Sequence, residues 1–127
     1  MIFAVDVARL CLRLCFLAAL ALGLAFWSGH ALHDVPIHMA IGVIFVLALW
    51  ALGIFGLMTR VNLALSLLAL GWGVLVLWLG TEQVHLVMSG HLSEMVKGLH
   101  FLAGIIAMGI GEPLGKRITA AGAPASA

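Results

Sequence analysis

Four long apolar runs dominate this sequence and restrict the folds that the chain can adopt. They lie near residues 8–28, 36–58, 61–81 and 92–111, and each is close to the 20 or so apolar residues that a helix needs to cross a bilayer. Only 9% of the 127 residues are charged, against roughly a quarter in a soluble domain. The chain is therefore predicted to be an integral membrane protein with four transmembrane helices and the lipid bilayer as its surroundings.

The connections between these runs are short, so consecutive helices are predicted to be antiparallel neighbours. An all-α, up-down four-helix bundle over residues 1–117 follows. The second helix is expected to start at Pro36, with Asp34 available as its N-cap. Residues 118–127 are small, polar or flexible, and a disordered C-terminal tail is predicted there.

The basic residues predict the orientation of the bundle. Lys97 lies on one side of the predicted membrane, and the other five lie on the opposite side. The positive-inside rule then places both termini in the cytoplasm, as expected in a bacterial inner membrane. The first helix is predicted to be retained rather than cleaved as a signal peptide. The five basic residues on the side opposite Lys97 are Arg9, Arg13, Arg60, Lys116 and Arg117.

The net charge of the chain is +1, which gives no indication of a nucleic-acid partner.

The phrase His-x-x-x-Gly occurs twice, as His38 to Gly42 and as His100 to Gly104, each near the start of an apolar run. A glycine four residues after a histidine lies beside it on the same helix face, where it leaves room for a large planar cofactor. Both histidines are expected about one turn inside the membrane, so their depths match within roughly 5 Å. The pair is predicted to supply the two axial ligands of one haem.

Two neutral imidazoles on one iron give a low-spin centre suited to electron transfer. The sequence has no Cys-x-x-Cys-His, so the group would be a non-covalent haem b. The alternative reading of His38 and His100 is a pair of polar residues that hydrogen-bond across the bundle. Cys11 and Cys15, four residues apart, are interpreted as small core residues.

Other polar residues on the same side of the membrane have more than one reading. His30 and His91, in two Ser-Gly-His phrases, are candidates to bond the haem propionates, as is Lys97. A competing interpretation is a Zn, Cu or Ni site built from four loop histidines. The four loop histidines are His30, His33, His85 and His91.

On the opposite side of the membrane, Glu112 is expected to form an ion pair with Lys116, four residues later in the same helix.

At its second and fourth apolar runs the chain resembles the four-helix membrane b-type cytochromes of the cytochrome b561-like group. The stretches that carry the resemblance are 38–57 and 100–111, where a histidine and a glycine four later precede a long aliphatic run. The resemblance implies haem iron ligated by His38 and His100. Those cytochromes commonly hold two haems, one toward each face, whereas this chain has histidines on one side only. One haem near the periplasmic face is therefore expected.

The resulting prediction is electron transfer with a quinone or a periplasmic redox protein, rather than catalysis on a soluble substrate. Two alternatives stay open: a histidine-lined transition-metal binding or transport protein, and a haem-free structural subunit of a membrane complex. A homodimer is also open, with His30 or His91 available for a second haem at its interface.

Overall fold

Four long helices make up most of the described structure, which is a computed structural model covering residues 1–88 and 94–122. They are α1 (Ile2–Trp27), α2 (Val35–Thr59), α3 (Leu63–Met88) and α4 (Glu94–Ala121), with a short 3-10 turn, η1 (Leu32–Asp34), before α2. Each of the four contains a segment that is long and apolar enough to cross a membrane. The predicted all-α four-helix bundle is confirmed.

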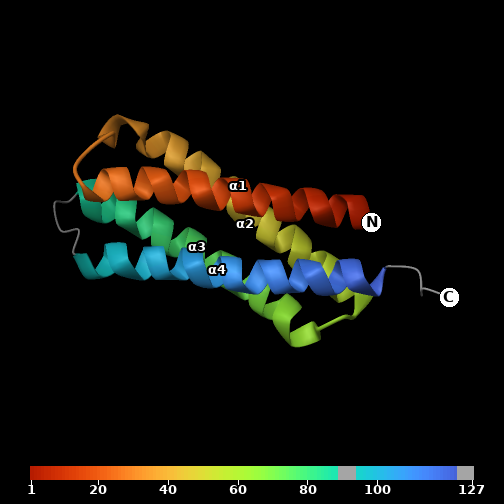
Figure 1. Cartoon of the computed structure of the whole chain (residues 1–127). Helices are drawn as coiled ribbons and strands as arrows, with labels where there is room; N and C mark the ends of the chain where they lie inside the picture. Colours follow the sequence, from red (N-terminus) through yellow and green to blue (C-terminus); the bar gives the residue numbers. More distant parts are fainter. Residues whose placement is uncertain (89–93, 123–127) are drawn as a thin grey trace.

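The helices run up and down in chain order (Figure 1). Each packs against its neighbours in sequence, α1 packs against α4, and α2 also touches α4 diagonally across the bundle. The N-terminus, the α2–α3 connection and the end of α4 lie at one end, called here the termini end. The α1–α2 connection lies at the other, called the histidine end because His38 and His100 lie in the half of the bundle next to it.

The helices extend past the apolar runs that predict them. Helix α4 continues through Pro113 to Ala121, so residues 118–121, predicted to lie in a disordered tail, are helical and Ile118 is fully buried. Residues 123–127 lie outside the described part. Helix α2 begins at Val35, but Asp34 makes no side-chain cap bond; its carboxylate lies 3.2 Å from His33 Nε2 instead.

The packed core lies in the termini half and the middle of the bundle. Its fully buried members include Leu12, Leu49, Leu52 and Leu114, one or two from each of α1, α2 and α4. By contrast, no residue from 13 to 44 is buried, and none from 94 to 102. The bundle is therefore tightly packed at one end and loosely packed at the other.

Glycines allow the close approach of helices in the packed half. A Cβ placed on Gly73 of α3 would overlap the indole of Trp50, and Trp50 Nε1 donates to the Leu70 carbonyl at 3.0 Å. A Cβ on Gly111 of α4 would likewise overlap Leu12 of α1. Small residues at helix crossings are a common device for close packing in membrane bundles.

Glu112 joins α4 to α1 and does not pair with Lys116, so that prediction is wrong. Its carboxylate accepts from Arg13 Nε at 2.6 Å and Arg13 Nη2 at 2.7 Å, and it lies 3.4 Å from Arg9 Nη2. A bidentate arginine–carboxylate pair is stronger than a single i,i+4 contact with a lysine. The neighbouring helix therefore provides the better partner.

Candidate cofactor site at the histidine end

The two histidines of the doubled His-x-x-x-Gly phrase meet between α2 and α4. The ring centroids of His38 and His100 lie 6.3 Å apart, with an angle of 56° between the ring planes. They reach the same level because α2 and α4 run in the same direction, and both residues lie one to two turns into their helices. The matched depth expected from the sequence is present in the structure.

The centroid distance suits one metal ion held between two imidazoles. An imidazole nitrogen binds a transition metal at about 2.0–2.1 Å and lies roughly 1.1 Å from its own ring centre, so opposed ligands have centroids about 6.3 Å apart. The observed separation is 6.3 Å. The separation of the two ring centres therefore matches that of a pair of imidazoles that share one metal ion.

A cavity of about 680 Å³ surrounds these rings and is lined by all four helices. Its volume lies within the roughly 300–1,000 Å³ typical of cofactor and ligand sites. The interior is apolar and aromatic, with Phe16 of α1, Phe45 of α2 and Val76 of α3 at its inner end. Phe26 also packs edge-on against the His38 ring, at a centroid distance of 5.4 Å. Such a lining suits a large apolar ligand.

The Nδ1 atoms of both imidazoles are buried. Nδ1 of His100 has no hydrogen-bond partner in the described part of the chain, whereas the His38 ring also interacts with the backbone of Ala19 on α1. An unsatisfied buried polar group costs about 1–3 kcal/mol, so such groups in a folded protein require an explanation. The Ala19 contact is of the kind expected if His38 hydrogen-bonds across the bundle.

Gly42 and Gly104 differ from the packing glycines of the other half. A Cβ on Gly42 would meet no atom within 4 Å, and one on Gly104 would only touch Phe16, at 4.0 Å. Both glycines line the cavity. Their missing side chains therefore widen the cavity beside each histidine and are not required for any helix crossing.

Two further glycines, not anticipated from the sequence, lie against the edges of the imidazoles. A Cβ on Gly23 of α1 would lie 3.7 Å from His38 Cε1, and one on Gly80 of α3 would lie 3.4 Å from His100 Cε1. Each histidine thus lies beside a glycine of the helix that precedes its own. The surroundings of the two histidines are therefore alike in this respect.

The polar part of the cavity lies toward α3 and α4. Lys97 lines the cavity on this side, together with Thr81 and Gln83. Lys97 Nζ lies 2.7 Å from Glu94 Oε1, and the second oxygen of Glu94 accepts from Trp27 Nε1 at 2.7 Å. The cavity therefore has an apolar interior and a cationic group near the surface of the bundle.

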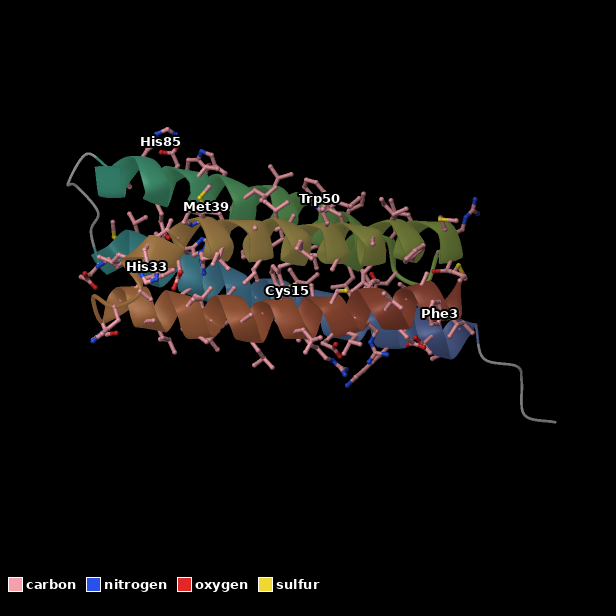
Figure 2. All side chains as sticks on the ribbon, turned by 90° about the horizontal axis from the view of Figure 1, so that it is seen from above. Phe3, Cys15, His33, Met39, Trp50 and His85 are labelled. Atoms are coloured by element: carbon pink, nitrogen blue, oxygen red, sulfur yellow. The ribbon has the colours of Figure 1, made fainter. Side chains whose placement is uncertain are left out.

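His30, His33 and His85 do not line the cavity. His30 is exposed, does not line the cavity, and has Nδ1 3.1 Å from Ser28 Oγ. Figure 2 shows His85 pointing outward from α3, away from His33. Across residues 1–88 and 94–122, no three histidine, cysteine or carboxylate side chains form a group able to hold a metal. His91 lies outside the described residues.

Comparison of the chain with protein-family models, with curated proteins and with solved structures finds no match. The class of protein is therefore given by the fold and the site alone. It is a bundle of four helices, each able to span a membrane, with a paired-histidine cavity at one end.

Proposed function

We propose that the chain is a membrane b-type cytochrome that binds one haem between His38 and His100 and transfers electrons. The observation that carries the proposal is the pair of imidazoles, with ring centres 6.3 Å apart, that both line a cavity of about 680 Å³. The open faces at Gly42 and Gly104 provide space on the helix surfaces beside both ligands. When bound, a bis-imidazole haem supplies reversible one-electron chemistry.

Side chains of the cavity would set the reduction potential of the haem and hold it in place. Phe16, Phe26 and Phe45 exclude water from the interior, and burial is one determinant of the reduction potential of haem. Lys97 is positioned to pair with a propionate in exchange for Glu94. His30 and His91 remain further candidates for propionate contacts, although His30 lies outside the cavity.

The proposal extends to the partner and the membrane. The distribution of basic residues supports cytoplasmic termini in a bacterial inner membrane, which puts the histidine end at the periplasmic face. A quinone or a periplasmic redox protein would then exchange electrons at that end. A homodimer is compatible with this arrangement.

The second candidate function is binding of a bare transition-metal ion by His38 and His100, which the same 6.3 Å separation favours. A single ion would occupy only the space between two nitrogens and leave most of the 680 Å³ cavity without a role. The size of the cavity and the open glycines therefore favour a large planar group.

A reduced-minus-oxidised absorption spectrum of the purified protein tests the proposal. We expect a sharp low-spin b-type α-band that is lost in His38→Ala and in His100→Ala, and retained in His85→Ala, which removes an exposed histidine outside the cavity. A colourless protein with stoichiometric Zn, Cu or Ni would support the second candidate. A colourless, metal-free protein that co-purifies with other membrane subunits would indicate a structural role.

Lys97→Gln tests the propionate contact. Its affinity for haem should fall, while its affinity for haem dimethyl ester, in which the propionates are uncharged, should match that of the unaltered protein. Equal losses for both compounds would show that Lys97 acts on folding and not on the propionate.

A further inference from the structure

A cluster of charged side chains joins α1 and α4 in the termini half, far from the histidines. Arg13 uses Nε and Nη2 for Glu112 and leaves Nη1 without a hydrogen bond in the described structure; its side chain is 47% exposed. Lys116 is exposed, lies one helical turn after Glu112 on the same face, and has no ion pair with the described residues. The basic members Arg9, Arg13 and Lys116 are called here the basic cluster.

Arg9 is held in place more firmly than a surface arginine. Its aliphatic stem lies against Gly115, where a Cβ would overlap Arg9 Cδ, and only 17% of its side chain is exposed. Nη1 lies 3.5 Å from Asp6 and Nη2 lies 3.4 Å from Glu112, but Nε is buried without a partner. Arg9 therefore contributes a fixed positive charge beside Arg13, but its unpaired Nε is buried and does not reach the surface.

The depth of the basic cluster matches that of lipid headgroups. Trp27 is 43% exposed at the histidine end of α1, where an aromatic residue is expected at a membrane interface. Arg9 precedes it by 18 residues in the same helix, or about 27 Å. A bilayer's hydrocarbon core is about 30 Å thick. Arg9 therefore lies near the opposite interface, where phospholipid phosphates are found. Arg13 lies about 21 Å from Trp27 by the same measure, one turn deeper, and its long side chain has to extend toward that interface.

The net charges of the two ends of the bundle also favour lipid binding at the termini end. The termini end carries five basic residues against two acidic ones, a net charge of +3. The histidine end carries one basic residue against three acidic ones, a net charge of −2. Anionic phospholipids are attracted to clustered basic residues at the membrane surface, so the termini end is the one that would recruit them.

We propose that the basic cluster binds the phosphate group of an anionic phospholipid between Arg13 and Lys116. Arg13 Nη1 and Lys116 Nζ supply charged donors toward the lipid, while Arg9 adds a fixed positive charge behind them. Glu112 orients Arg13 and leaves the cluster with an excess of positive charge. The proposal rests on the chain spanning a bilayer and is independent of any haem.

Lipid titrations of the detergent-solubilised full-length protein, read by native mass spectrometry, test the site. Lys116→Gln should weaken binding of phosphatidylglycerol about fivefold, the effect expected for one basic residue near a membrane surface. Arg60→Gln is the matched control, because Arg60 is also exposed at the termini end and lacks an ion pair in the described structure. It should leave the affinity unchanged. Neither substitution removes a packing contact of the core.

Two further measurements distinguish a lipid phosphate from free inorganic phosphate as the ligand, and either can overturn the proposal. Phosphatidylcholine should bind at least fivefold more weakly than phosphatidylglycerol, and inorganic phosphate should compete only weakly with the lipid. Equal binding of the two lipids, or equal losses in Lys116→Gln and Arg60→Gln, would show nonspecific attraction. Full competition by inorganic phosphate would identify a site for the free anion and not for a lipid.

Discussion

Replacing Gly42 by alanine should change folding stability and haem affinity in opposite directions. A Cβ at this position meets nothing within 4 Å, so the empty protein gains only the better helix propensity of alanine, up to about 1 kcal/mol. The same methyl group would project into the cavity beside His38, against the face of a bound macrocycle. Overpacking of a well-fitted site costs about 1–3 kcal/mol, which corresponds to a loss of roughly 5- to 150-fold in haem affinity.

Thermal unfolding of the haem-free protein in detergent, followed by circular dichroism, gives the stability. Absorption titration with haem gives the affinity. Gly71→Ala is the matched control, because a Cβ there also meets nothing within 4 Å but Gly71 does not line the cavity. It should gain the same stability and bind haem normally. If Gly42→Ala binds haem as tightly as Gly71→Ala does, the macrocycle does not lie against this face of α2, and the reasoning is refuted.

Three other substitutions test the packed half of the bundle by chemical or thermal unfolding in detergent. Glu112→Gln should lower the free energy of unfolding by about 1–3 kcal/mol, because two arginines lose a charged partner; no loss would mean that the pairs are solvent-screened. Gly115→Ala should cost up to about 2 kcal/mol, because displacing the stem of Arg9 costs about 1–3 kcal/mol and the better helix propensity of alanine returns up to about 1 kcal/mol; a gain in stability would contradict the close contact. Trp72→Phe removes the 2.9 Å bond from the indole N–H to the Ala103 carbonyl and should cost about 1 kcal/mol; an unchanged Tm would argue against that bond.

The sequence predicts features that depend on one helix at a time. Helical periodicity places Gly42 beside His38 and Gly104 beside His100, whatever the rest of the fold does. The level of each histidine follows from the start of its own apolar run. These local rules were sufficient to predict the four helices and the matched level of His38 and His100.

Contacts between two helices could not be predicted from the sequence in the same way. Gly23 and Gly80 lie beside the histidines only because α1 and α3 have particular rotations and heights relative to α2 and α4. Those rotations are fixed by many side-chain contacts distributed through the core, which no local spacing encodes. The ion pair of Glu112 with Arg13 also depends on how α1 and α4 are placed relative to each other. The spacing of Glu112 and Lys116 in one helix can be read from the sequence, but the proximity of Glu112 to a residue of another helix cannot.

The uneven packing of the bundle has a consequence for how it opens. In the termini half, glycines allow the helices to approach closely and fully buried leucines pack between them. By contrast, residues 13–44 and 94–102 contribute no buried side chain. Local opening requires least free energy where few apolar contacts must be broken. The helices can therefore separate at the histidine end while the opposite half acts as a hinge, and a ligand as large as a haem could be inserted without global unfolding. Amide hydrogen exchange in the empty protein should rise steadily from Leu49 toward His38 along α2, and a filled cavity should abolish that gradient.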